Sequence, residues 1–165
     1  EKSIFIITAA HVVNAAKSIE IIDFSGNSAT AVIQAIDARR DIAILQTELI
    51  GTGIAIRQDE PLIGSHVCAL GNSFGLGTGM TCGIVSAVRR SNIGFNEIED
   101  FIQTDAAVNP GMSGGALVDP KGRLVGLIDG IFTKEADIDA GVNFAISVPL
   151  IQESLASQLE AGVQF

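Results

Sequence analysis

The chain has 165 residues, a length typical of one domain or of two small halves that share a cleft. Hydrophobic residues make up 47% of it, and 18 glycines without any Trp or Tyr favour short apolar strands joined by tight turns. A net charge of −9 with only ten Lys and Arg residues argues against a nucleic-acid binder, and no apolar run is long enough to cross a bilayer.

Apolar runs with period-2 or continuous β-branched character recur along the chain between turn signals, and they predict strands. In chain order the predicted strands are Ser3–Thr8, Ser18–Asp23, Thr30–Asp37, Ile42–Gln46, His66–Leu70, Met80–Val88, Phe101–Thr104, Gly115–Val118, Leu124–Ile131 and Val142–Ile146. A hairpin turn is predicted at Asp119–Gly122, because Pro120 presets one turn position and Gly122 accepts a positive φ. We therefore expect an all-β fold, as a barrel or sandwich pair.

Two segments interrupt this pattern. The polar stretch Arg57–Gly64 contains Pro61 and predicts a connector between a first unit, residues 1–56, and a second unit, residues 64–147. Residues 149–161 predict one amphipathic helix, with Pro149 in its first turn and Gly162 as its stop signal. Its apolar residues recur at i, i+4 spacing: Leu150, Ile151, Leu155 and Leu159.

The two cysteines, Cys68 and Cys82, form no CxxC pattern, and two distant histidines do not complete a zinc site. No metal and no cofactor are expected. The favoured interpretation is a pair of small buried hydrophobic residues. The alternative is a cross-strand disulfide, since both cysteines lie in strand-like runs that flank one glycine-rich loop.

Three short segments carry residue types that suit nucleophilic catalysis. His11 follows an apolar strand, Asp41 precedes another, and Ser113 lies in a glycine-rich turn before a third. A serine hydroxyl needs a neighbouring base, an imidazole can take and return its proton near neutral pH, and a buried carboxylate orients that imidazole. Gly111 allows its own N–H and that of Ser113 to converge as an oxyanion hole. We therefore predict a catalytic triad of His11, Asp41 and Ser113.

The segments TAAHVV, DIAIL and NPGMSGGALV resemble the triad segments of the trypsin-like serine peptidases, and in particular of the HtrA (high-temperature-requirement) family. The resemblance continues through VCALGNSFGLGTGMTCGIVSAVRRS, EDFIQTDAAVNPG and GVNFAISVPL, from about Ser3 to Gly162. It implies a trypsin-like double β-barrel with the active site between the barrels. It also implies a serine endopeptidase of protein quality control that cleaves unfolded or misfolded polypeptides, in the bacterial periplasm or cell envelope or, alternatively, in an organelle lumen.

The chain departs from the family pattern in several places. Met112 stands where relatives carry Asn, and the first barrel is shortened at its start. The PDZ domain that commonly follows the last helix, and the N-terminal segment through which relatives form trimers, lie outside the sequence. We expect a mature or trimmed part of a longer protein, in which a PDZ domain follows and a homotrimer is an option.

The primary substrate pocket is expected beside Ser113. Because its walls are mostly small or aliphatic and no acid stands where an enzyme specific for basic residues would place one, we predict cleavage after Val, Ala, Ile or similar residues. The strand at Ile128–Gly130 is expected to pair with an extended substrate, and Asp129 to be a solvated edge residue, with charge selectivity as the alternative. The residues expected to contact substrate are Ala107, Val108, Ile128, Asp129, Gly130 and Ile131.

Two other functions are compatible with parts of this pattern. A protease-like module could hold misfolded chains without cutting them, although such a module has no need of all three triad residues. An esterase could use the same triad, but its usual fold orders the three residues differently. Three glycine-rich or polar loops are expected to be mobile: Asn72–Gly79, Ser91–Glu99 and Phe132–Gly141. The resemblance to the HtrA family implies that they order together with the oxyanion turn.

Overall fold

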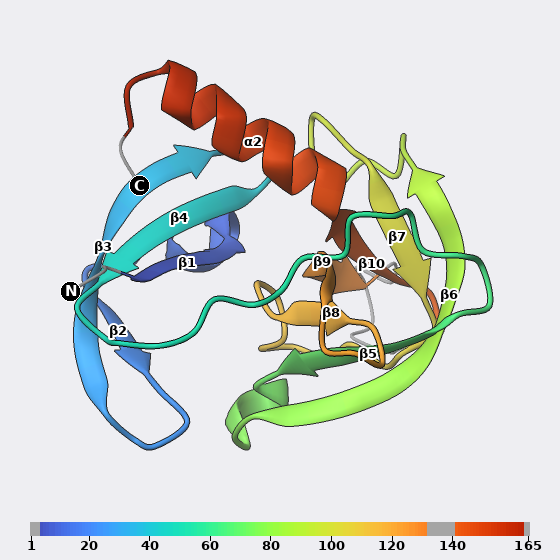
Figure 1. The fold of residues 1–165 in the computed structure, drawn as a ribbon, viewed down its shortest axis with the longest axis horizontal. Helices are drawn as coiled ribbons and strands as arrows, with labels where there is room; N and C mark the ends of the chain where they lie inside the picture. The colour runs from blue at the N-terminus through green and yellow to red at the C-terminus, as the bar shows by residue number, and fades with distance from the viewer. Residues whose placement is uncertain (1–3, 132–140, 164–165) are drawn as a thin grey trace.

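The computed structural model describes residues 4–131 and 141–163, which form two β units with one helix lying across them (Figure 1). The first unit is an open antiparallel sheet in the order β1-β4-β3-β2. It comprises β1 (Ile4–Ala9), β2 (Ile19–Ile22), β3 (Ser28–Asp37) and β4 (Ile42–Thr47). The predicted all-β class is confirmed.

The second unit is a closed barrel in the order β10-β7-β6-β5-β8-β9. Its strands are β5 (His66–Gly71), β6 (Gly79–Arg90), β7 (Phe101–Thr104), β8 (Ala116–Val118), β9 (Leu124–Ile131) and β10 (Asn143–Ser147). The segment between β4 and β5 contains the predicted connector and runs across the front of both units in Figure 1. The double-barrel expectation holds, with the first unit present as an open four-stranded sheet in the described part of the chain.

Every predicted strand is present, with ends that agree to within two residues. Two one-turn helices, α1 (Ala10–Val13) and η1 (Ser73–Gly75), were not predicted. Segments of three or four residues are too short to display a helical period, so only tertiary contacts can specify them.

The C-terminal helix α2 (Val148–Glu160) begins and ends as the sequence predicts. The Ser147 hydroxyl accepts a hydrogen bond from the Leu150 N–H at 3.3 Å, and Gly162 adopts a φ of 91° just after the helix. Among the described residues, no helix has the length and apolar character needed to span a membrane.

The helix and one core cluster hold the two units together. Ile42 of β4 packs in the same buried cluster as barrel residues such as Phe101 and as Ile151 of α2. The buried Ser154 hydroxyl of α2 donates to Asp37 of β3 at 2.8 Å. Because the segments that carry the two predicted halves of the site belong to different units, these contacts set their relative position.

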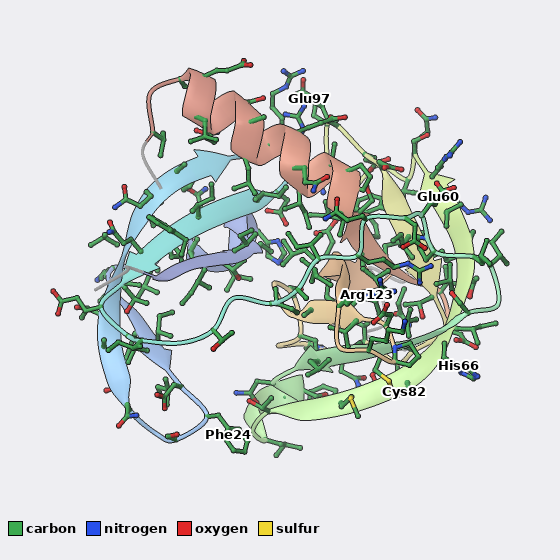
Figure 2. The ribbon with its side chains drawn as sticks, viewed as in Figure 1. Phe24, Glu60, His66, Cys82, Glu97 and Arg123 are labelled. Atoms are coloured by element: carbon green, nitrogen blue, oxygen red, sulfur yellow. A yellow bond between two sulfur atoms is a disulfide. The ribbon has the colours of Figure 1, made fainter. Side chains whose placement is uncertain are left out.

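Cys68 and Cys82 lie directly opposite each other on β5 and β6 and are joined by a disulfide, with a Cα–Cα distance of 4.1 Å. The favoured sequence interpretation, two small buried hydrophobic residues, is therefore wrong. Cys82 is exposed at the outer face of the barrel, near His66, whose side chain points away from the body of the molecule (Figure 2). Strand pairing, which sequence spacing alone does not reveal, brings the two sulfurs together.

Candidate active site

The pairing of β1 with β4 brings His11 and Asp41 together. Ala9 lies opposite Ile42, so the residues just beyond this pair, at the start of α1 and before β4, become neighbours. The Ala10 N–H donates to the Asp41 carbonyl at 3.0 Å, and the His11 N–H donates to Asp41 Oδ1 at 2.8 Å. The other carboxylate oxygen, Oδ2, lies 2.5 Å from His11 Nδ1.

Asp41 itself has the backbone conformation of a tight corner. Its φ is 56°, in the left-handed region that Asp tolerates better than most residues. The residue is 8% exposed, whereas the His11 side chain is 52% exposed. One end of the imidazole is thus held by a buried carboxylate while the ring faces solvent.

Ser113 comes from the barrel, in the turn that leads into β8. Gly111 and Gly114 have φ angles of 95° and 82°, which a side chain rarely allows, and a Cβ on Gly114 would strike the Thr8 hydroxyl of β1. The Gly114 N–H donates to the Ile128 carbonyl at 2.7 Å. The glycines therefore allow the serine turn to lie directly against both the first sheet and β9.

The Ser113 hydroxyl donates to the backbone carbonyl of Asp129 at 2.9 Å. In the described part of the chain it makes no hydrogen bond with His11, and the N–H groups of Gly111 and Ser113 donate to no protein acceptor. These are the two backbone donors that the sequence assigns to an oxyanion hole, and that role stays a prediction.

Met112 anchors this turn in the barrel core. Its side chain is 1% exposed, packs within the barrel cluster against Gly71, and accepts a hydrogen bond from the Asn109 N–H at its sulfur, 3.4 Å away. The residue that departs from the family pattern therefore points away from Ser113.

A cleft of about 460 Å³ opens between the two units. It is lined by Ala10, His11, Asn14, Ile36, Ala38, Asp41, Phe95, Asn96, Asp129 and Gly130. Ser113 is not one of these lining residues, but its hydroxyl is bonded to the backbone carbonyl of Asp129, which is. A second cavity, of about 70 Å³, lies between the connector and the start of α2, away from these groups.

Asp129 is not the solvated edge residue expected from the sequence. It is 6% exposed, and its carboxyl group hydrogen-bonds with Asp41 and accepts a bond from Asn96 Nδ2 at 3.0 Å. Burial, together with the hydrogen bond and negative charge of Asp41, raises the pKa of Asp129 to about 7, while His11 and Asn96 act in the opposite direction. The strand pattern predicts an exposed edge, but this position faces the other unit.

Asn96 is held in place by an organised loop between β6 and β7. The Glu99 carboxylate accepts hydrogen bonds from the N–H groups of residues 93–96, at 2.7–3.1 Å. Partial burial disfavours the charge of Glu99, but the four N–H donors outweigh it and lower its pKa. Asn96 is not recognisable from the sequence, because a single polar residue in a loop carries no pattern that marks it.

The other residues predicted to contact substrate lie in different environments. Val108 and Ile128 are buried in the barrel core, Ala107 is half-buried with its carbonyl bonded to Thr81, and Gly130 lines the cleft. The backbone of Ile131 belongs to β9, and its side chain lies outside the described residues. Of the three loops expected to be mobile, residues 132–140 also lie outside them.

His11, Asp41 and Asp129 offer oxygen and nitrogen atoms that all lie within 4.8 Å of one another. Both Asp41 oxygens are already bonded to His11, and Asp129 is bonded to Asp41 and Asn96. We therefore interpret the group as a cluster that shares protons, and the absence of a metal site stays a prediction.

Several known proteins are similar to this chain over nearly its whole length. Residues 1–127 match the family model of the trypsin-like peptidase domain. The chain is 39% identical over 164 residues to a probable periplasmic serine endoprotease DegP-like of Buchnera aphidicola, and 37% identical over 161 residues to the periplasmic serine endoprotease DegP of Salmonella typhimurium. These alignments cover 98% and 96% of this chain but 35% and 34% of the relatives, so the chain spans about a third of their length.

Among solved structures, the HtrA-type protease AlgW with a decapeptide matches with a TM-score of 0.90 and 39% identity, over 96% of this chain and 49% of that one. The trypsin-like double-barrel fold inferred from the sequence is thereby confirmed.

Proposed function

Because the chain belongs to the trypsin-like peptidase domain family, we propose that it is the catalytic domain of a serine endopeptidase with His11, Asp41 and Ser113 as its triad. The observation that carries the proposal is the contact between His11 Nδ1 and Asp41, 2.5 Å apart, in a cleft whose lining residue Asp129 is bonded to the Ser113 hydroxyl. A buried carboxylate bonded to Nδ1 leaves Nε2 as the proton acceptor, which is the tautomer that nucleophilic attack requires.

In the proposed reaction the Ser113 hydroxyl exchanges its bond to the Asp129 carbonyl for one to His11 through rotation about χ1. His11 takes the hydroxyl proton while Oγ attacks the peptide carbonyl, and Asp41 stabilises the imidazolium that forms. The N–H groups of Gly111 and Ser113 bind the oxyanion. His11 then protonates the leaving amine, and water hydrolyses the acyl-enzyme by the same route.

Labelling with a fluorophosphonate tests the proposal directly. The wild-type chain should react at Ser113, the Ser113→Ala variant should not, and its kcat should fall about 10⁶-fold. Ser91 is exposed and does not line the cleft, so Ser91→Ala should label like the wild type. Equal labelling of wild type and Ser113→Ala would contradict the assignment.

One observation favours a second function, a module that binds polypeptides without cutting them. The Ser113 hydroxyl is bonded to the Asp129 carbonyl rather than to His11. The labelling experiment separates the two functions, because a silent module that retains its fold does not react at any pH.

We extend the proposal to substrates that are locally extended polypeptides. The β8–β9 pairing ends near Ile128, and in the described chain no strand pairs with residues 129–131 on that edge, which supports substrate addition as a strand beside Gly130. Aliphatic residues around Ser113 support cleavage after small or medium aliphatic residues. A peptide library that shows preference for Arg or Lys before the scissile bond would contradict this specificity.

Location and assembly belong to the same proposal. Relatives named as periplasmic endoproteases and an exposed disulfide support a periplasmic or envelope location. The limited share of the relatives that this chain spans is consistent with further domains, for which we propose a PDZ domain and, in the full-length protein, a homotrimer.

A further inference from the structure

The carboxyl group of Asp129 has an environment that the triad mechanism does not use. It lies beside Asp41 and within 4.8 Å of the ligand atoms of both Asp41 and His11, and it is 6% exposed. Two carboxyl groups in contact cannot both be ionised without strong repulsion, because little water separates them. One proton shared between them removes the repulsion and makes a hydrogen bond.

The identity of the protonated partner follows from the contacts. Asp41 accepts hydrogen bonds from the backbone and from the ring of His11, which favour its ionised form. Within residues 4–131 and 141–163, the side-chain hydrogen bond that the Asp129 carboxyl accepts comes from the neutral amide of Asn96. Burial then favours the neutral acid at Asp129, in agreement with its raised pKa.

Resting on the function proposed above, we propose that Asp129 is a positioning residue of the triad. In its protonated form it donates a hydrogen bond to Asp41 and holds that carboxylate against His11, and when it loses the proton this support is replaced by repulsion. Asp41 then moves away from the imidazole, and the activity of this chain falls as the pH rises.

We expect the proton on Asp129 to be what changes the local charge as the pH rises. Among the residues that the structure describes, Asp41 and His11 are the titratable groups that face it. In the strands β1, β8 and β10, which pack against β9 or pair with it, the described ranges contain no charged residue. Glu97 of the loop pairs with Arg39 at 2.8 Å, and Glu153 of α2 pairs with Arg40 at 3.7 Å.

The test compares the pH profile of kcat in the wild type, in Asp129→Asn and in the control Glu97→Gln. Asn keeps the size and an N–H donor but cannot titrate, and Glu97 is an exposed acid next to Asn96. The wild type and the control should lose about tenfold in kcat between the maximum and about pH 9, while Asp129→Asn keeps a plateau. An identical alkaline decline in Asp129→Asn, or no decline in the wild type, overturns the proposal.

A second variant, in the loop between β6 and β7, tests whether the titration of Asp129 causes the alkaline decline. The Asn96 amide favours the ionised form of Asp129, so Asn96→Ala should move the alkaline decline of the wild type to higher pH. An unchanged midpoint in Asn96→Ala counts against the proposal.

The pH dependence of the free energy of unfolding tests the proton on Asp129 without any measurement of catalysis. The pKa of Asp129 is about 7 in the folded chain against an ordinary value of 3.8, so the folded state binds this proton more tightly than the unfolded state does. The contribution of this proton to the free energy of unfolding is complete below about pH 4 and is lost as the pH rises through 7. In urea denaturation, the free energy of unfolding of the wild type should therefore decrease over this pH range, and that of Asp129→Asn should lack this decrease.

The two readouts separate the failure of this proposal from failure of the proposed function. A wild type that never reacts with the fluorophosphonate removes the peptidase, and with it the positioning role. If Asp129→Asn does not fold, Asp129→Thr, which keeps a hydroxyl donor, takes its place in both measurements. If the free energy of unfolding depends on pH equally in the wild type and in the folded variant, the proposal that Asp129 is protonated is overturned.

Discussion

Asp41 carries out several structural tasks with one side chain and one carbonyl. Its carboxylate bonds to the backbone and the ring of His11, and its carbonyl accepts from Ala10. The first turn after β1 is therefore built around this residue, and the imidazole is oriented before any substrate binds. Preorganisation of this kind reduces the rearrangement needed in the transition state.

Replacing Asp41 by Asn should separate orientation from charge. Asn tolerates the φ of 56° and can still accept one bond, so the fold should persist. The amide favours the wrong imidazole tautomer and cannot stabilise the imidazolium, and kcat should fall about 10⁴-fold at neutral pH. Steady-state kinetics on a peptide substrate measures this, with Asp23→Asn, a partly exposed residue that does not line the cleft, as a control. A loss below about tenfold would remove Asp41 from the triad.

The loop between β6 and β7 shows how an irregular element acquires order. Four consecutive N–H groups point at one carboxylate, that of Glu99, and the ring of Phe95 packs edge-to-face against Phe101 and Phe144. Backbone groups that no strand partner satisfies are thereby paired within the loop. This arrangement places Asn96 against Asp129.

Glu99→Gln should destabilise the loop between β6 and β7. The amide retains the shape but loses the charge that strengthens the N–H bonds, at a cost of about 1 kcal/mol once solvent screening of this partly exposed group is allowed for. Because the folded pKa of Glu99 is lowered, its contribution is present above about pH 4.5 and is lost as the pH falls below that value. Hydrogen exchange at residues 93–96 should accelerate in the variant, but not in Glu97→Gln.

At the scale of the whole molecule, the proposed site depends on two β units being held in one orientation. His11 and Asp41 belong to the sheet, Ser113 and Asp129 to the barrel, and α2 contacts both. The helix lies across the units in Figure 1, and Glu97, at the tip of the β6–β7 loop, lies near it in Figure 2.

Ser154→Ala tests the link between the units. The hydroxyl, 1% exposed, donates to the buried Asp37 carboxylate, which also pairs with Arg40 at 3.0 Å. Removal of a buried hydrogen bond to a charged group should lower the free energy of unfolding by about 1.5–3 kcal/mol. The exposed Ser157→Ala, on the same helix, should stay within about 0.5 kcal/mol of wild type in urea denaturation. Equal effects of both substitutions would show that the link carries no stability.

The sequence alone predicted the strands and the C-terminal helix, and it supplied the hypothesis of the triad. Strand periods, the turn at Asp119–Gly122 and the helix after Pro149 depend on neighbouring residues, so local patterns predict them. The order of His11, Asp41 and Ser113, with their flanking motifs, was likewise visible as a family resemblance.

What surrounds these residues was decided by tertiary structure. The disulfide depends on which strands pair, the burial of Asp129 on which unit covers its face, and the role of Asn96 on how Glu99 folds a loop. Each is a contact between residues distant in the chain, and its energy depends on desolvation and mutual charge. Local patterns contain no such information, which is why the proton on Asp129 could be inferred only from the folded chain.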